Sequence, residues 1–283
     1  MTERAVLNAL EQLPETLHDH YDRVLAMIDR QSKPVRDIAG NAISCLLTSA
    51  SRLSCSQLLE AIASRKPATS FAELDIIRSP ERVVQACHNL VAIASDGTIG
   101  FVHYSVQEFF TSDHLKNSSN PALKVHYCDP VVAQFEMGMT CLNFLCLRGS
   151  KDGTFWSYAA NYFPTHLADR FMTEGQDLVQ AVQLFQNAYT VEVASMYLES
   201  ESQIAQSPVQ LAAQLGLSNI LRGIFSTSLV PRDMSDLERA LRLASLRGHQ
   251  HIVGLLIEQG VHIGAASPRS RVPRFWFSDG NVS

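Results

Sequence analysis

Apolar residues recur every three or four positions along most of this chain, which is the spacing of one face of an α-helix. One such stripe runs through residues 16–31. A second follows Pro34, which suits a first helical turn because its missing N–H would be unpaired there. A short apolar helix is expected at 55–63, with Ser54 or Ser56 as its cap. The first stripe consists of Leu17, Tyr21, Val24, Leu25 and Ile28.

The apolar period changes from helix to strand at residues 90–103. Two short apolar runs flank an Asp-Gly pair at 96–97, which is the sequence signal of a β-hairpin. Before the hairpin, Ser79 is expected to cap a third helix, and after it Ser105 is expected to cap another. Three helices and then a hairpin are the order of a winged-helix domain. The alternative is an α+β module of no specific type.

The chain is expected to be helical again after a polar segment at 117–130, whose Asn, Ser and Pro content is typical of a linker. Residues 131–147 are apolar nearly all round, so this helix should be buried. An aromatic stripe at 154–167 is best interpreted as helix-packing core and not as a ligand site. Further apolar helical segments are expected at 178–184 and 191–198.

An internal repeat occupies the last third of the chain. Residues 207–216 align with 239–248, so that two glycines fall 32 residues apart, close to the 33-residue ankyrin period. The second copy resembles an ankyrin repeat, because Gly248-His249 separates two helical segments and Gly260 follows the second. The first copy is degenerate, with Gln210 at the position where histidine is usual. We therefore expect about two ankyrin repeats.

The first half is similar to the region after the NTPase core of fungal NACHT-type (STAND) signalling ATPases. The resemblance rests on the Leu-Pro-Glu-Thr-Leu run at 13–17, the Arg-Leu-Ser step at 52–54 and the run Phe-Val-His-Tyr-Ser-Val-Gln-Glu-Phe-Phe at 101–110. Such proteins often continue into ankyrin repeats, and a winged-helix histidine in the wider class senses nucleotide. His103 matches that position, although a structural role is the favoured interpretation.

The NTPase core itself is missing. No G-x-x-x-x-G-K-[ST] phosphate-binding loop occurs, and none of the lysines stands in that frame. The chain therefore resembles the C-terminal part of such a protein, as a shortened relative or a remnant. The lysines are Lys33, Lys66, Lys116, Lys124 and Lys151.

These patterns together predict a mainly α fold in five parts. A helical and winged-helix-like domain is expected at 1–116, a linker at 117–130 and a helical capping region at 131–205. Ankyrin repeats are expected at 206–266 and a flexible tail at 267–283. The capping region is required because two repeats bury their apolar faces only against neighbours.

Composition narrows the classes of function. Hydrophobic residues make up 46% and charged residues 18%, which fits a folded core and excludes a disordered chain. The formal net charge of -5 gives no general attraction for nucleic acid or anionic lipid. Six cysteines without a C-x-x-C pair indicate reduced thiols, and no apolar run is long enough to span a membrane. We expect a cytoplasmic or nuclear protein.

The chain lacks the sequence signatures of catalysis. It has no G-x-S-x-G, H-E-x-x-H or G-x-G-x-x-G string, and its histidine pairs are spaced two apart, which places them on different helix faces. The third helix offers Arg82 against Glu81, so direct nucleic-acid binding is not expected. We therefore predict no enzyme activity, no catalytic residues, no cofactor, no metal, no small-molecule substrate and no membrane partner.

The predicted function is an adaptor that binds another protein, a transcription factor or a signalling component, through its ankyrin surface. One alternative is a nuclear transcription coregulator, and another is a regulatory fragment acting in trans on a NACHT-type ATPase. The tail could add a linear binding motif, because three arginines lie beside Phe-Trp-Phe at 275–277, or it could be an untethered terminus. The predicted partner-binding residues are Leu246, Arg247, His249, Gln250 and His262.

Overall fold

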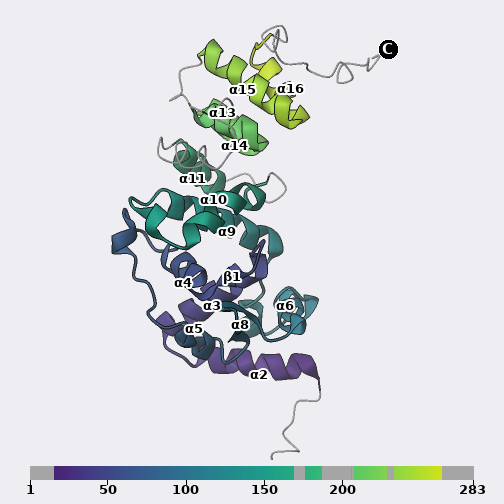
Figure 1. Cartoon of the computed structure of the whole chain (residues 1–283). Helices are drawn as coiled ribbons and strands as arrows, with labels where there is room; N and C mark the ends of the chain where they lie inside the picture. The colour runs from purple at the N-terminus through teal and green to yellow at the C-terminus, as the bar shows by residue number, and fades with distance from the viewer. Residues whose placement is uncertain (1–15, 169–175, 187–204, 206, 228–232, 263–283) are drawn as a thin grey trace, which may run out of the picture. The chain divides into compact units, whose positions relative to one another are not determined.

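The computed structural model describes residues 16–168, 176–186, 205, 207–227 and 233–262, and in these the chain is mainly helical, as predicted (Figure 1). The chain divides into two compact units. The first contains Met1–Thr140 and Leu147–Tyr158, and the second contains Cys141–Cys146 and Ala159–Ser283. Within the described residues, no helix is long and apolar enough to cross a membrane.

The first unit begins with helices α2 (Leu17–Asp29) and α3 (Lys33–Thr48). Thr16 starts α2 through a capping box, in which its side chain accepts from the Asp19 backbone and the Asp19 side chain accepts from the Thr16 backbone. Four of the five predicted stripe residues are buried, but Leu17 is 54% exposed because it begins the first turn, outside the packed part of the helix. Pro34 stands in the first turn of α3, as predicted.

A small antiparallel sheet follows. Strand β1 (Leu53–Ser54) leads into α4 (Cys55–Ala63), and η1 (Phe71–Glu73) and α5 (Glu81–Ala86) precede β2 (Val91–Ile93) and β3 (Thr98–Phe101). The strand order is β1-β3-β2, with Val91 opposite Phe101. Gly97 forms the hairpin turn with a φ of 78°, a conformation that glycine adopts without steric cost.

Two of the predicted helix caps are wrong and one is confirmed. Ser54 caps α4 with Gln57, as expected. Helix α6 (Tyr104–Phe110) starts earlier than predicted, so that His103 is the cap and Ser105 lies inside the helix. Pro80 precedes α5, and the Ser79 hydroxyl donates to the Glu81 carboxylate instead of accepting a backbone N–H. Ser79 bonds to the nearby Glu81 carboxylate and Ser105 bonds to His103 and to the distant Tyr21, so neither hydroxyl caps a helix.

The expected linker at 117–130 is part of the first unit. It follows α7 (Asp113–Lys116) and contains α8 (Pro121–Lys124), whose cap is Asn120. After α8, His126 Nε2 lies 3.0 Å from Asp29 Oδ1 and the Cys128 amide donates to the Phe110 carbonyl. Contacts with α2 and α6 thus order a segment whose composition alone indicated a loop.

Helix α9 (Pro130–Leu145) is apolar on most sides and is buried through its second half, as predicted, whereas Val131, Val132 and Glu136 in its first half are exposed. After η2 (Ser150–Asp152), helix α10 (Phe155–His166) carries the aromatic stripe, of which Phe155, Tyr158 and Phe163 are buried core residues. Glu60 of α4 accepts hydrogen bonds from the Thr154 and Phe155 amides at 3.1 and 2.8 Å. A buried carboxylate thus caps the start of α10.

The second unit continues with α11 (Gln176–Phe185), α13 (Pro208–Leu215), α14 (Ser218–Ser226), α15 (Met234–Arg247) and α16 (Gln250–Glu258). Helices α11 and α14 approach closely at Gly223, where a Cβ would lie 2.5 Å from Val182 Cγ2. The helix expected at 191–198 and the tail at 267–283 lie outside the described residues.

Candidate functional site

The region predicted to bind a partner consists of two helix pairs, α13 with α14 and α15 with α16 (Figure 1). In each pair the first helix ends at a glycine in the left-handed conformation, Gly216 with φ 75° and Gly248 with φ 76°. This conformation reverses the chain within a few residues, which allows the second helix to pack beside the first. The sequence repeat therefore corresponds to a repeated local structure.

His249 ties the two helix pairs together. Its Nε2 lies 3.0 Å from the Gln214 carbonyl oxygen, which can only accept, so Nε2 carries the hydrogen. The same ring lies so close to Gly216 that a Cβ there would be 2.8 Å from it. His249 is half-buried, so its ring has an internal partner, and its predicted role in partner binding stays a prediction.

A polar cluster makes a second link between the pairs. Asp236 near the start of α15 accepts from the Ser207 hydroxyl at 2.7 Å and from the Gln210 amide at 2.6 Å. Ser207 also caps α13 by accepting from the Gln210 backbone. The Gln210 side chain thus bonds to the second copy of the sequence repeat. The degenerate first copy is thereby joined to the second by side chains that the repeat pattern did not predict.

The other predicted binding residues are exposed, but they do not form one cluster. Leu246, which is 53% exposed, and the exposed Arg247 and Gln250 lie at the turn between α15 and α16. His262 is also exposed but follows the far end of α16. A nine-residue helix separates positions 250 and 258 by about 12 Å. Leu246, Arg247 and Gln250 thus lie together at the α15–α16 turn, apart from His262, and their role in partner binding stays a prediction.

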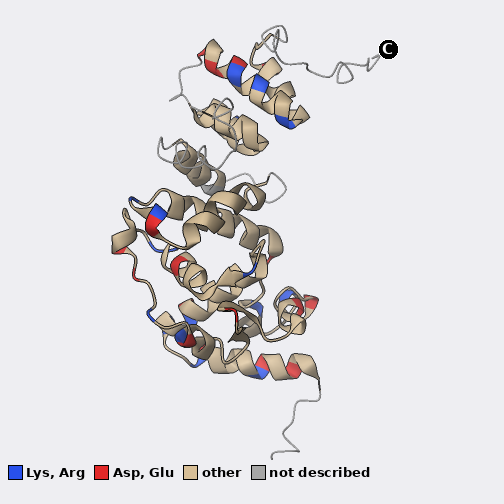
Figure 2. Cartoon of the chain, viewed as in Figure 1, with Lys and Arg blue, Asp and Glu red and all other residues tan. Residues whose placement is uncertain are grey.

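Charge on the two helix pairs is uneven. In Figure 2 the ribbon of α15 is coloured for both acidic and basic residues, whereas α13 contains neither. The basic residues of α15 are Arg239, Arg242 and Arg247, and its acidic residues are Asp236 and Glu238. Because the two signs are mixed, this helix has no single-sign field for nucleic acid.

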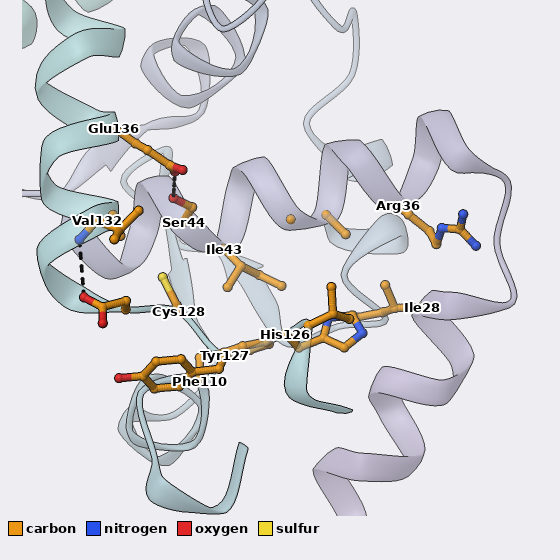
Figure 3. Close-up of a pocket in the computed structure, with 15 residues that line it drawn as sticks. Ile28, Arg36, Ile43, Ser44, Phe110, His126, Tyr127, Cys128, Val132 and Glu136 are labelled. Atoms are coloured by element: carbon orange, nitrogen blue, oxygen red, sulfur yellow. Dashed lines mark hydrogen bonds between the residues drawn. The ribbon is translucent and has the colours of Figure 1, made fainter. Parts of the chain in front are cut away.

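A second candidate site, which sequence reasoning missed, lies within the first unit. A pocket of about 300 Å³ opens between α3, α9 and the segment 125–129 (Figure 3). Residues Arg36, Gly40, Ile43 and Ser44 of α3 line one wall, spaced as one helix face. In Figure 3, Arg36 stands at one end of this row and Glu136 at the other. The complete lining is Ile28, Arg36, Ala39, Gly40, Ile43, Ser44, Phe110, Val125, His126, Tyr127, Cys128, Asp129, Val132, Ala133 and Glu136.

The polar groups of the pocket are positioned by local contacts. Asp129 caps α9 by accepting from the Val131 amide at 2.9 Å. Glu136 receives a hydrogen bond from the Ser44 hydroxyl at 3.4 Å. Burial, followed by the nearby Glu136 carboxylate, raises the pKa of the Cys128 thiol to about 11. This thiol is therefore protonated at neutral pH and is no activated nucleophile.

Among the described residues of the first unit, a serine–histidine pair lies at the start of α6. Ser105 Oγ lies 2.6 Å from His103 Nδ1 and 2.7 Å from the Tyr21 hydroxyl. The Ser105 amide donates to the same Nδ1 at 3.2 Å, which makes this nitrogen an acceptor and the ring a helix cap. Ser105 is buried, so a substrate cannot reach its hydroxyl. Among the described residues, no cluster of histidine, cysteine and carboxylate side chains could hold a metal ion.

No protein-family model matches the chain, and no solved structure matches it. Among curated proteins, the chain is similar to the azaphilone pigments biosynthesis cluster protein L of Monascus ruber. The two are 25% identical over 298 aligned residues, which cover 90% of this chain and 61% of that protein. The chain thus spans less than two thirds of the length of this relative.

Proposed function

We propose that the chain is a non-enzymatic adaptor that binds another protein through the α15–α16 turn. The proposal rests on a difference in side-chain exposure within the α15–α16 pair. Its apolar residues Leu255 and Leu256 are buried, whereas Leu246 is exposed at the turn beside Arg247 and Gln250. An exposed leucine beside polar groups at the end of a packed helix pair suits protein recognition.

The repeat architecture supports this proposal. Positive-φ glycines at the ends of α13 and α15, and the bond from His249 to the preceding repeat, are compatible with two ankyrin repeats. For the first unit we propose a winged-helix-like domain, because α3, α4 and α5 precede the β2–β3 hairpin along the chain and β1 pairs with β3 in the sheet. Both assignments fit the proposed origin as the C-terminal part of a NACHT-type protein.

Two other functions stay as proposals for the same surface. A transcription coregulator would bind its transcription factor in the nucleus, and a regulator in trans would bind a separate NACHT-type ATPase in the cytoplasm. Similarity to a protein named for a pigment biosynthesis cluster is compatible with each of them. Imaging the tagged chain in its native cell distinguishes the nuclear role from the cytoplasmic roles.

Affinity purification with quantitative mass spectrometry tests the adaptor proposal. The full chain is compared with a triple variant, Leu246→Ala, Arg247→Ala and Gln250→Ala, which changes only exposed side chains of the turn. His262→Ala serves as a matched control on an exposed residue beyond the far end of α16. We expect the triple variant to lose at least one partner that the control retains. Retention of every partner by the triple variant would refute this binding surface.

A further inference from the structure

The pocket between α3, α9 and residues 125–129 has an apolar interior and an uncovered apolar rim. Ile43 and Phe110 are buried around it, whereas Val125 and Val132 are 74% and 56% exposed. Its volume of about 300 Å³ is at the lower limit for small-molecule sites, which are typically apolar hollows with a few polar groups that orient the ligand. All of its lining residues belong to the first unit. The pocket thus suits a small ligand with an apolar body.

Most charged groups around the pocket already have a partner within the protein. The Glu136 carboxylate lies 3.6 Å from the Arg65 guanidinium. Asp129 accepts backbone hydrogen bonds as the cap of α9. His126 Nε2 lies 3.0 Å from Asp29 Oδ1. A basic ligand would therefore have to compete with these internal partners for each carboxylate of the lining.

Arg36 is the charged group of the lining that has no counter-charge. Its Nη1 donates to the Asp29 backbone carbonyl at 2.8 Å, and Figure 3 shows it at one end of the row of α3 residues. Among the described residues, no carboxylate forms an ion pair with it. The guanidinium is exposed and has further N–H donors in a planar fork, which matches the two oxygens of a carboxylate. The charge that complements this pocket is therefore negative.

Gly40 leaves space between Arg36 and the apolar interior. Positions 36, 40 and 43 lie on the same face of α3, because they are three or four residues apart. A Cβ at Gly40 would meet no heavy atom within 4 Å, so internal packing does not require glycine here, although glycine is unfavourable within a helix. Since Gly40 lines the pocket, its missing side chain leaves room for an apolar chain that extends from Arg36 toward Ile43.

We propose that this pocket binds a small amphipathic carboxylate, whose carboxylate group pairs with Arg36 and whose apolar body lies against Gly40, Ile43 and Phe110. A liquid water occupies about 30 Å³, so the pocket has room for about ten groups of water size, and octanoate is a molecule of that size. The site binds its ligand without converting it, which is compatible with the prediction of no small-molecule substrate. Because the pocket and the α15–α16 turn belong to different units, this proposal does not rest on the adaptor proposal.

Isothermal titration calorimetry of the full chain with octanoate, octan-1-ol and octylamine tests the proposal. The three probes have the same apolar chain and differ only in the charge of the head group. We expect octanoate to bind about two- to fivefold more tightly than octan-1-ol, which is the contribution of an exposed ion pair, and octylamine to bind most weakly. Octanoate should also bind more tightly than hexanoate, by about fourfold for each methylene group that the pocket buries. Absence of octanoate binding, or equal affinity for the three head groups, overturns the proposal.

Filling the pocket tests where octanoate binds. Gly40→Leu should weaken octanoate binding by about tenfold or more, because the new side chain and the ligand compete for the same space. Gly254→Leu is the matched control, since Gly254 is also an exposed helical glycine with no atom within 4 Å of a Cβ, and it should leave the affinity unchanged. Undiminished octanoate binding by a Gly40→Leu chain with native circular dichroism overturns the proposed site.

Changing the charge at position 36 tests the role of the guanidinium. Arg36→Gln should abolish the preference for octanoate over octan-1-ol while leaving octan-1-ol binding unchanged, and Arg36→Glu should reverse the preference in favour of octylamine. Arg30→Gln is the control, because it removes the same charge from an exposed arginine outside the lining. Retention of the octanoate preference in Arg36→Gln overturns the proposed pairing. The triple variant of the α15–α16 turn should bind octanoate as the unaltered chain does, so the failure of one proposal is distinguishable from that of the other.

Discussion

Replacing Gly216 by alanine measures how tightly the two helix pairs are joined. Gly216 and Gly248 end equivalent helices with nearly identical φ values of 75° and 76°. A Cβ at Gly216 would lie 2.8 Å from two atoms of the His249 ring, whereas a Cβ at Gly248 would meet nothing within 4 Å. Gly248→Ala is therefore a matched control that has the backbone strain without the contact.

The expected free-energy changes follow from these two surroundings. Alanine in the left-handed conformation costs about 1 kcal/mol, which is the whole expected loss for Gly248→Ala. Gly216→Ala adds overpacking against the His249 ring, at about 1–3 kcal/mol, for a total of about 2–4 kcal/mol. Removing the ring in Gly216→Ala/His249→Ala relieves the overpacking, so the double variant should lose about 1–3 kcal/mol less than the sum of the single variants.

Hydrogen exchange with mass spectrometry is the suitable assay, because the two compact units can open separately and a single unfolding midpoint would mix them. Peptides covering α13 and α15 report the free energy of opening of each repeat. If Gly216→Ala and Gly248→Ala lower the free energy of opening equally, a Cβ at position 216 does not clash with the His249 ring. Additive losses in the double variant would refute the close contact between the helix pairs.

Three further changes test other contacts. Glu60→Gln replaces one acceptor oxygen of the carboxylate that bonds the Phe155 amide, and it should destabilise the first unit by about 2 kcal/mol in urea denaturation; an unchanged midpoint would contradict this cap. Gly223→Ala should destabilise the second unit by about 1–2 kcal/mol despite better helix propensity, since its Cβ would lie 2.5 Å from Val182. Adding Val182→Ala should recover stability, and a stabilising Gly223→Ala would refute the close approach. Burial lowers the pKa of His166 to about 4 from its usual value near 6.5, so the unfolded chain binds the proton first as the pH falls. The second unit should lose about 3 kcal/mol between pH 6.5 and 4, monitored by hydrogen exchange corrected for intrinsic rates, and a flat profile would contradict the buried neutral ring.

Features set by neighbouring residues were predicted well. The helical period, the first-turn Pro34, the Ser54 cap, the hairpin at Asp96-Gly97 and the repeat glycines each depend on a few adjacent positions. The expected caps at Ser79 and Ser105 failed because several polar groups compete for the same amides, and the sequence does not rank them.

The candidate sites depended on contacts between distant positions. The sequence indicated His249 as a surface residue, but its bond to Gln214 exists only after the two helix pairs pack. The segment 117–130 has the composition of a linker, yet Asp29 and Phe110 order it.

Local periodicity by itself thus determined which segments of this chain form helices and strands, because backbone hydrogen bonds and caps act over three to four residues. Only the tertiary structure decided the pocket, because α3, α9 and the segment 125–129 come together only in the folded chain, with Arg36 and Glu136 at opposite ends. It also decided which of the predicted binding residues remain exposed, because burial depends on side chains that come together only in the folded chain.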